Sequence, residues 1–389
     1  MILSVDGLSP ASLQTYGCSW QPTPRFNRLA SQSIVFERCM SDTVMSHQSL
    51  VSMIMGKHSA ALVGDGREHQ KSWIGNISAE LVTDDYQIAE LSAASFFENQ
   101  TVIPYLIPDV ARQDVEETAM GDLFAGGLEV IAEAGSDLIW LHLSSLTRCW
   151  DAPRSLCFVD DEMQPPSDAM PPSNVQIERT DPDQLLAWMM VYGGQVRLLD
   201  LLLGLLVDRI DESSADGTTM LVVVGTQGMP LGETGDFGCS SSRYRSPLLH
   251  VPLLMRIPGR ASLRCPNLCQ PFEIGRTVES WLAGESGGLL RHASPRGWAD
   301  MNASTQWTLS VDEQGNWISF QSQWWHLVSE ASETMLFRKP DDRFDVNDIA
   351  GRVPVVRDAM QRHATAALRN LSEEMDRHPL PFDILSGSW

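Results

Sequence analysis

The hydrophobic positions of this chain fall into short runs that alternate with longer amphipathic stretches. Residues 2–5, 34–36, 137–143 and 220–224 are apolar runs bounded by polar or glycine positions, as is typical of buried parallel strands. Amphipathic spacing between them predicts helices, the longest over residues 184–210. Strands that alternate with helices predict an α/β fold, with a doubly wound, mainly parallel sheet flanked by helices.

Capping and breaking residues place further elements. Pro24 suits the first turn of a helix, and Ser46 stands where an N-cap would fall, ahead of an apolar run that ends at Gly56. Residues 247–258 predict another strand, and residues 272–282 predict a helix. Between these elements, residues 151–183 are polar and rich in proline, which predicts a long surface loop.

The hydrophobic pattern changes near residue 304, which divides the chain into two predicted parts. Residues 1–303 form the α/β domain, and residues 304–389 form a small C-terminal α+β subdomain packed on it. In the second part a helix over residues 355–374 follows three short strands of an antiparallel sheet, at residues 307–311, 317–320 and 324–328.

Composition narrows the possible partners. The formal net charge is −22, from 28 Lys and Arg against 50 Asp and Glu, which argues against nucleic acid and anionic membrane surfaces. No run of about eighteen apolar residues is present, so no membrane span is expected. The N-terminus lacks the basic start and long apolar stretch of a secretory signal, which predicts a cytoplasmic protein. Seven scattered cysteines without a CxxC pair predict reduced thiols.

Four segments, in order, resemble the landmarks of the sulfatase family of the alkaline phosphatase superfamily. Residues 5–8 (VDGL) resemble the strand end that places a metal-binding Asp in that family. Residues 23–30 (TPRFNRLA) are similar to its TPNLDRLA helix, and residues 46–56 (SHQSLVSMIMG) to its CxPSRxSLLTG signature. Residues 222–228 (VVVGTQG), followed by residues 231–233 (LGE), are similar to its SDHG strand end and LGEHG sequel. The resemblance covers nearly the whole chain and implies the sulfatase fold.

The resemblance also implies a calcium site, and this chain departs from it. The family holds the cation with a paired Asp after the first strand, and with an Asp and an amide or His after the later strand. Here Asp6 is followed by Gly7, and the later positions are Thr226 and Gln227. One carboxylate where about three are expected is too little charge for tight calcium binding. No cofactor is therefore expected, and Ca²⁺ is expected only if the site is functional.

The implied nucleophile is a formylglycine made from Cys or Ser, and Ser46 occupies that position. The Pro and Arg that accompany it in the family are Gln48 and Leu50 here, and Leu cannot replace the planar donor fork of Arg. The Lys and His of a further family motif are missing from residues 91–95. Arg148 lies where the leaving-group His would fall, and is the candidate substrate-binding residue.

Each surviving candidate has a structural alternative. Asp6 is a metal ligand or a cap for the following turn, and Ser46 is a nucleophile or an N-cap. His47 is a candidate general base, but adjacent helical positions do not face each other, which favours a solvent-facing side chain. His142, in the predicted strand over residues 137–143, points into the site or is a core histidine with satisfied hydrogen bonds.

Two functional hypotheses follow. In the first, the protein has the fold of a sulfuric ester hydrolase with a degenerate site, and acts as a binding or regulatory module for a small anionic ligand. In the second, it is an active sulfate- or phosphate-ester hydrolase that uses Ser46, with Asp6, His47, His142 and Arg148 as parts of a rearranged site. Such parts would meet at the carboxyl ends of the strands, where sheets of this kind bind ligands.

Overall fold

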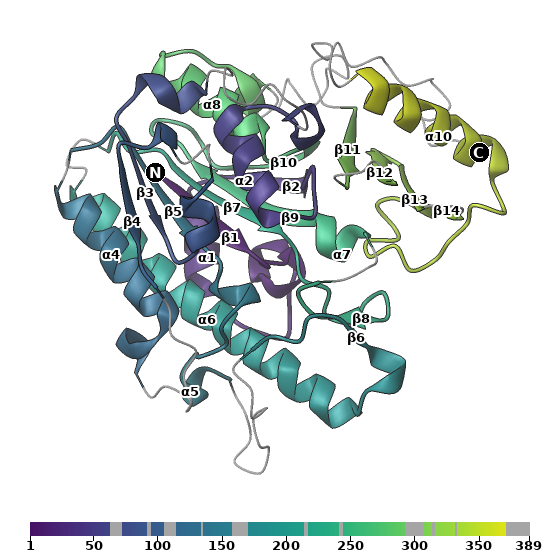
Figure 1. Ribbon diagram of the computed structural model, residues 1–389, viewed down its shortest axis with the longest axis horizontal. Helices are drawn as coiled ribbons and strands as arrows, with labels where there is room; N and C mark the ends of the chain where they lie inside the picture. The colour runs from purple at the N-terminus through teal and green to yellow at the C-terminus, as the bar shows by residue number, and fades with distance from the viewer. Residues whose placement is uncertain are drawn as a thin grey trace. The chain divides into compact units, whose positions relative to one another are not determined.

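A computed structural model gives the structure of the chain (Figure 1), and describes residues 1–62, 72–91, 95–104, 114–133, 135–157, 170–213, 217–240, 244–291, 306–312, 316–330 and 333–370. The larger sheet has the strand order β10-β2-β9-β7-β1-β5-β3-β4. Its strands are β1 (Ile2–Asp6), β2 (Ile34–Met40), β3 (Ala79–Thr83), β4 (Asn99–Val102), β5 (Leu138–Leu143), β7 (Leu221–Gln227), β9 (His250–Arg256) and β10 (Leu263–Cys269). Five neighbouring strands are parallel to one another, in the order β7, β1, β5, β3 and β4. β9 is antiparallel to β7.

The smaller sheet is antiparallel with the order β11-β12-β13-β14, and β6 pairs with β8 in a two-stranded ribbon. The bounds are β6 (Val175–Gln176), β8 (Asp236–Phe237), β11 (Trp307–Val311), β12 (Trp317–Ser322), β13 (Trp325–Glu330) and β14 (Glu333–Arg338). The α-helices are α1 (Pro24–Ala30), α2 (Ser46–Met55), α3 (Tyr86–Ala89), α4 (Ala119–Glu133), α5 (Arg154–Cys157), α6 (Pro182–Ser213), α7 (Ser246–Leu249), α8 (Glu273–Leu282) and α10 (Pro354–Arg369). The predicted fold class, a mainly parallel sheet with helices and a small antiparallel sheet, is confirmed.

The chain divides into two compact units, each made of several segments. Unit 1 comprises Met1–Val35, Ile74–Ser242 and Pro252–Leu263; unit 2 comprises Phe36–Trp73, Arg243–Val251 and Arg264–Trp389. The domain boundary predicted near residue 303 lies outside the described residues, so that prediction stays untested.

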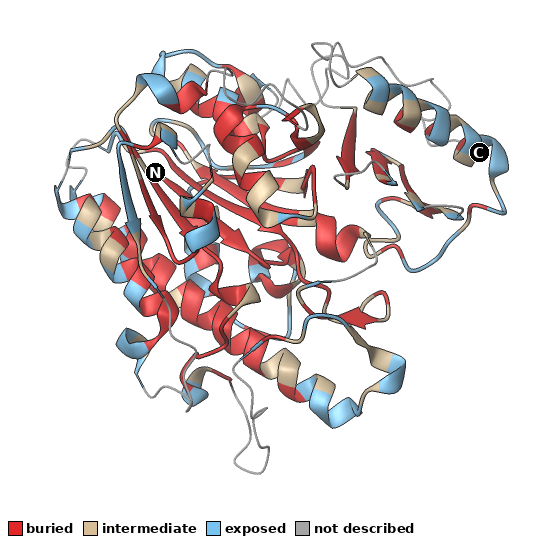
Figure 2. Cartoon of the chain, in the orientation of Figure 1, coloured by how far each residue is buried: buried red, intermediate tan, exposed pale blue. Residues whose placement is uncertain are grey.

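Unit 1 is built around the central parallel strands and the long helix α6. Figure 2 shows these strands and the middle of α6 as largely buried. Leu198, Leu203 and Leu206 on α6 pack with β1 residues such as Leu3 and Val5 in one core cluster. By length and composition α6 could cross a membrane, but 83% of its apolar window is buried within the structure. Its apolar surface is therefore that of a core helix.

Asp200 shows how the chain joins α6 to α1 within unit 1. Its carboxylate accepts hydrogen bonds from the backbone N–H groups of Arg25 and Phe26, both at 2.9 Å. These N–H groups belong to the first turn of α1, which has no intrahelical partner for them. A buried charge on α6 thereby supplies the cap that the N-cap residue Thr23 does not make.

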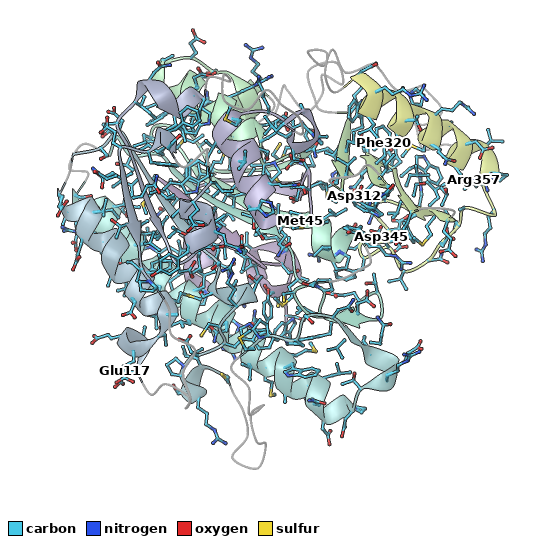
Figure 3. All side chains as sticks on the ribbon, in the orientation of Figure 1. Met45, Glu117, Asp312, Phe320, Asp345 and Arg357 are labelled. Carbon is cyan, nitrogen blue, oxygen red and sulfur yellow. The ribbon has the colours of Figure 1, made fainter. Side chains whose placement is uncertain are left out.

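In unit 2 one face of the small sheet packs against α10. Phe320, Leu327 and Leu336 lie opposite one another on β12, β13 and β14. They join Val356 and Met360 of α10 in a core cluster. The tryptophans of this sheet are packing residues: Trp307, Trp317 and Trp325 are all buried. Figure 3 places Phe320 on the sheet beneath the helix that carries Arg357.

Several elements differ from the sequence-based expectations. The stretch predicted as one strand over residues 247–258 begins with the short helix α7, because Pro247 suits a first helical turn, and only then becomes β9. The proline-rich segment contains α5 and β6, and its residues 158–169 lie outside the described part. The strands β3, β4, β10 and β14 and the helix α4 were not predicted. All seven cysteines lie in the described ranges as free thiols, as predicted.

Candidate functional site

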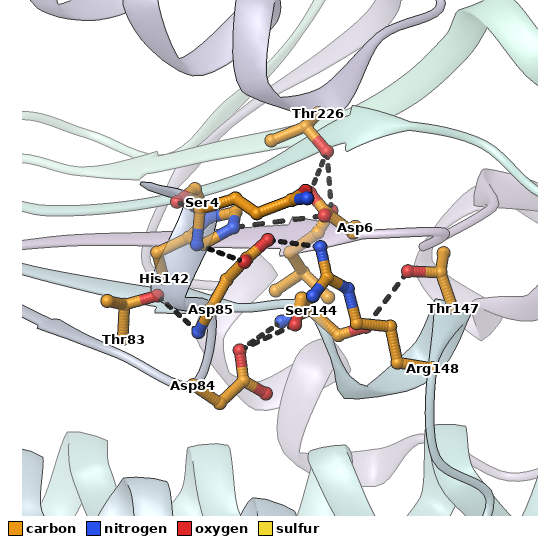
Figure 4. A network of polar contacts seen from close by, with 12 residues as sticks. Ser4, Asp6, Thr83, Asp84, Asp85, His142, Ser144, Thr147, Arg148 and Thr226 are labelled. Carbon is orange, nitrogen blue, oxygen red and sulfur yellow. Dashed lines mark hydrogen bonds and ion pairs between the residues drawn. The ribbon is translucent and has the colours of Figure 1, made fainter. Parts of the chain in front are cut away.

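The carboxyl ends of four neighbouring strands of unit 1 carry a cluster of polar side chains (Figure 4). β7, β1, β5 and β3 are adjacent and parallel, so their ends meet at one edge of the sheet. Crevices at such edges are where open α/β sheets bind ligands. The cluster contains three of the candidate site residues predicted from the sequence, Asp6, His142 and Arg148, together with Thr226.

Asp6 is the last residue of β1, and it is buried at 2% exposure. Its Oδ1 accepts a hydrogen bond from the hydroxyl of Thr226, next to it at the end of β7. The register of β1 against β7 shifts between Val5 and Asp6, which brings Gln227 opposite Asp6. Asp6 makes no hydrogen bond to the backbone of the following turn among the described residues, so the cap interpretation of this residue is wrong.

His142 lies on β5 opposite Ser4 of β1 and is fully buried. Its Nδ1 is 2.9 Å from Ser4 Oγ, which also accepts a hydrogen bond from the indole N–H of Trp140 at 2.9 Å. Its Nε2 lies 3.8 Å from Asp6 Oδ2. Nε2 has no hydrogen-bond partner among the described residues, so His142 is not the satisfied core histidine of the alternative interpretation.

Two further carboxylates stand at the end of β3, where the sequence analysis placed no site residue. Asp84 is buried, and its Oδ1 accepts from the backbone N–H of Ser144 at 2.7 Å and from the Ser144 hydroxyl at 2.8 Å. Burial raises the pKa of Asp84 to about 6, although His142 and the Ser144 hydrogen bonds act to lower it. The other oxygen, Oδ2, has no hydrogen-bond partner within the described part of the chain.

Arg148 pairs with the second of these carboxylates. Its guanidinium lies 2.5 Å from Asp85 Oδ2, and its side chain is 33% exposed where that of Asp85 is 3% exposed. Asp85 also caps the short helix α3 through its Oδ1, which accepts from the backbone N–H of Gln87 at 2.9 Å. Arg148 therefore has a structural partner in addition to its predicted role as a substrate-binding residue.

The backbone conformation and the surroundings of Gly7 explain why a glycine stands at this position. Its φ is +74°, in the left-handed region, and a Cβ built there would lie 2.6 Å from Thr147 Cγ2. Its carbonyl accepts a hydrogen bond from the buried hydroxyl of Tyr192 at 2.8 Å. The backbone at this position thus has no room for the second Asp that the sulfatase resemblance implies.

Ser46 and His47 belong to unit 2, at the start of α2. The N-cap of α2 is Met45, and Ser46 is the first helical residue. The interpretation of Ser46 as an N-cap is therefore wrong, while Gly56 ends the helix in the left-handed conformation, as predicted. Ser46 and His47 are both half-buried. Residues 92–94, part of the segment where the family's Lys and His were sought, lie outside the described residues.

The residues around Asp6 do not fit a calcium site. At the four positions implied by the resemblance stand one carboxylate, a glycine, a hydroxyl and an amide, and the hydroxyl already donates to the carboxylate. Calcium takes six to eight oxygen ligands, several of them carboxylates. No group of three or more His, Cys, Asp or Glu side chains within the described ranges is placed to hold a metal ion.

Comparison with solved structures identifies the class of fold. A phosphonate monoester hydrolase of Agrobacterium radiobacter matches with a TM-score of 0.72 at 15% identity, over 95% of each chain. A phosphonate monoester hydrolase from Silicibacter pomeroyi matches with a TM-score of 0.71 at 16% identity, over 97% of this chain and 96% of that one. A putative sulfatase from Bacteroides thetaiotaomicron matches with a TM-score of 0.72 at 11% identity, over 96% and 92%.

The chain therefore has the fold of these sulfatases and phosphonate monoester hydrolases, as the sequence motifs predicted. At such low identities the likeness concerns the fold alone, and the chemistry of the site has to be argued from its own residues. No family model matches the sequence, and no curated protein matches it either.

Asp84 and Asp85 could have been found from the sequence. Residues 79–83 (AELVT) form a short, mostly apolar run that is followed by two consecutive carboxylates, Asp84 and Asp85. Residues 2–5, followed by Asp6, show a similar pattern. The sulfatase motifs direct attention to residues 91–95 instead, and the resemblance implies a single carboxylate, Asp6, for the site. The structure places three at the edge of one sheet.

Proposed function

We propose that this protein is a sulfatase-fold binding protein that does not hydrolyse esters by the divalent-metal route. One observation carries the proposal: the hydroxyl of Thr226 donates to the carboxylate of Asp6, the residue that would bind the cation. A cation at that carboxylate would have to displace this hydrogen bond. The other two carboxylates at the same edge already have partners, Ser144 for Asp84 and Arg148 for Asp85, so they are not available to complete the oxygen ligands that calcium prefers. The backbone of Gly7 supports the proposal, because a second Asp cannot be added there without strain.

The absence of metal chemistry would remove most of the catalytic power expected of such a fold. A bound divalent ion polarises the ester and stabilises the charge that develops on it during transfer. Without it, an unmodified serine needs an adjacent base to become a nucleophile. His47 follows Ser46 directly on α2, and neighbouring helical positions do not face each other.

The test measures turnover and calcium binding on the full chain. We expect no hydrolysis of an arylsulfate or an aryl phosphonate monoester above the uncatalysed rate, with added Ca²⁺ or with EDTA. We expect no heat of calcium binding by isothermal titration calorimetry. Turnover that disappears in Ser46→Ala and in EDTA, and persists in the matched control Ser31→Ala on the exposed end of α1, would refute the proposal.

A second candidate function is an ester hydrolase that uses Ser46 in a rearranged site. The observation that favours it is the position of Ser46 itself: it is partly exposed in the first turn of α2, and the cap position belongs to Met45. Metal-independent turnover that is lost in Ser46→Ala and persists in Ser31→Ala would support this function over the first.

A further inference from the structure

Two buried polar atoms in the strand-end cluster of unit 1 lack hydrogen-bond partners among the described residues. They are His142 Nε2 and Asp84 Oδ2, on side chains that are 0% and 1% exposed. Buried polar groups in folded proteins nearly always have a partner, which is supplied by the protein, by water or by a ligand. His142 Nε2, which lies 3.8 Å from Asp6 Oδ2, therefore indicates a small polar group at this point of the cluster.

The hydrogen bonds around Ser4 decide which partner His142 needs. Trp140 Nε1 can only donate, so it occupies one lone pair of Ser4 Oγ. The Ser4 proton then goes to His142 Nδ1, because Ser4 is fully buried and has no other acceptor within the described residues. The neutral imidazole consequently carries its hydrogen on Nε2, which makes this atom a donor directed toward Asp6.

The charges of the cluster oppose an anionic ligand. Asp6, Asp84 and Asp85 stand at the same edge, and Arg148 is the cation that accompanies them in Figure 4. Arg148 is paired with Asp85 at 2.5 Å, so its charge is balanced within the protein. A sulfate or phosphate group would face the remaining carboxylates, and like charges at close range repel.

We propose that this cluster binds the hydroxyl group of a neutral polyol. The separation of His142 Nε2 and Asp6 Oδ2 is 3.8 Å, too long for a direct hydrogen bond. One hydroxyl oxygen can lie within hydrogen-bonding distance of both, accepting from Nε2–H and donating to the carboxylate. An ammonium cannot accept from Nε2–H, and a sulfate cannot donate to Asp6. The proposal rests on the proposed function, because a divalent ion at Asp6 would occupy the same place.

The test follows the imidazole of His142 by nuclear magnetic resonance in the full chain labelled with ¹⁵N-histidine. The nine histidines give few imidazole signals, and the signal that disappears in His142→Gln is that of His142. Glycerol and myo-inositol are the neutral probes, sodium sulfate is the anionic probe and methylammonium chloride the cationic one, at matched ionic strength. We expect a saturable shift of the His142 signal with a polyol and none with sulfate or methylammonium.

Two variants link the shift to the proposed geometry. In Asp6→Asn the charged acceptor is lost, and the dissociation constant of the polyol should rise about tenfold. In Ser4→Ala the donor to Nδ1 is lost, and the ¹⁵N shifts of His142 should change to those of the other tautomer, with weaker polyol binding. Asp358→Asn on the exposed surface of α10 is the matched control and should change neither.

Each other outcome counts against the proposal. A saturable shift with sulfate would assign the cluster to anions, and one with methylammonium alone would assign it to cations. The lack of a saturable shift with either polyol would mean that an ordered water alone completes the cluster. These outcomes are independent of the turnover and calcium measurements, so failure of this inference and failure of the proposed function are distinguishable.

Discussion

His326 Nδ1 lies 2.9 Å from Asp345 Oδ2 in unit 2, and both side chains are fully buried. Ser319 Oγ is 2.6 Å from Nε2 of the same ring, and Lys339 Nζ is 2.6 Å from Asp345 Oδ1. The serine, histidine and aspartate have the hydrogen-bond order of a nucleophilic triad. Ser319 is, however, 2% exposed and the lysine neutralises the carboxylate, so the arrangement is structural.

Asp345→Asn should destabilise the protein strongly. Asp345, labelled in Figure 3, also accepts from the backbone N–H of Ser246 at 2.6 Å, so it ties β13, α7 and the loop after β14 together. Removal of one partner of a buried ion pair leaves the other charge uncompensated and costs about 3–5 kcal/mol. Urea unfolding measures the change. The exposed Asp358→Asn should stay within about 0.5 kcal/mol of the unmodified protein; an equally small effect for Asp345→Asn would contradict the buried charge pair.

The same carboxylate should make stability depend on pH in acid. Burial alone would raise the pKa of Asp345, but the charges of His326 and Lys339 outweigh it and hold the pKa below its ordinary value. The stabilisation is therefore complete above the unfolded pKa of about 3.9 and is lost as the pH falls below it. Unfolding free energies of the unmodified protein and Asp345→Asn should converge between about pH 5 and pH 2. Parallel curves over that range would show that Asp345 does not carry the effect.

Asp84→Asn should stabilise the protein, with the opposite dependence on pH. The pKa of Asp84 is raised to about 6, so the folded state binds the proton more tightly than the unfolded state does. Stability therefore falls as the pH rises from about 4 through about 6. The amide oxygen can still accept from Ser144, and the gain at pH 8 should be about 2–3 kcal/mol, larger than at pH 5.

The matched control for Asp84 is Asp122→Asn, an exposed carboxylate on α4 in the same unit. Denaturant unfolding at pH 5 and pH 8 should show no pH-dependent gain in that variant. A loss of stability in Asp84→Asn at pH 8 would mean that the ionised carboxylate is needed by a partner in the cluster.

Gly7→Ala should cost stability for a backbone and a packing reason. The φ of +74° is strained for any residue with a Cβ, and the new methyl would lie 2.6 Å from Thr147 Cγ2. We expect a loss of about 1–3 kcal/mol. The double variant with Thr147→Ser removes the contacting methyl and should recover part of the loss, as measured by thermal unfolding. No recovery in the double variant would assign the whole cost to the backbone.

Tyr192→Phe tests the link between α6 and the turn after β1. The Tyr192 hydroxyl donates to Gly7 O at 2.8 Å and accepts from the backbone N–H of Ser9 at 3.3 Å. Its removal leaves a buried carbonyl and a buried N–H without their partner, which costs about 1–3 kcal/mol. Tyr86→Phe, at a tyrosine that is 56% exposed, is the control and should have little effect. Equal effects of the two substitutions in urea unfolding would contradict this role of Tyr192.

The sequence by itself determined the class of fold and many of its elements, because their signals are local, although it left β3, β4, β10, β14 and α4 unpredicted. Apolar runs the length of a strand, Pro24 at a first helical turn and Gly56 after a last one act over a few residues. The same local signals could not decide residues 247–258, where the helical preference of Pro247 and the strand pattern that follows compete. The family motifs, likewise local, predicted the fold that the comparisons show.

Only the tertiary structure decided what the site contains, because its atoms come from distant parts of the chain. Asp6 meets Thr226 across 220 positions and approaches His142 from a neighbouring strand. The sequence marks Asp84 and Asp85 as residues that follow a strand, but the count of carboxylates at one sheet edge depends on strand order, which periodicity does not encode. Whether a carboxylate meets a hydroxyl, a guanidinium or a lysine is set by packing, and this choice of partner fixes its charge and its chemistry.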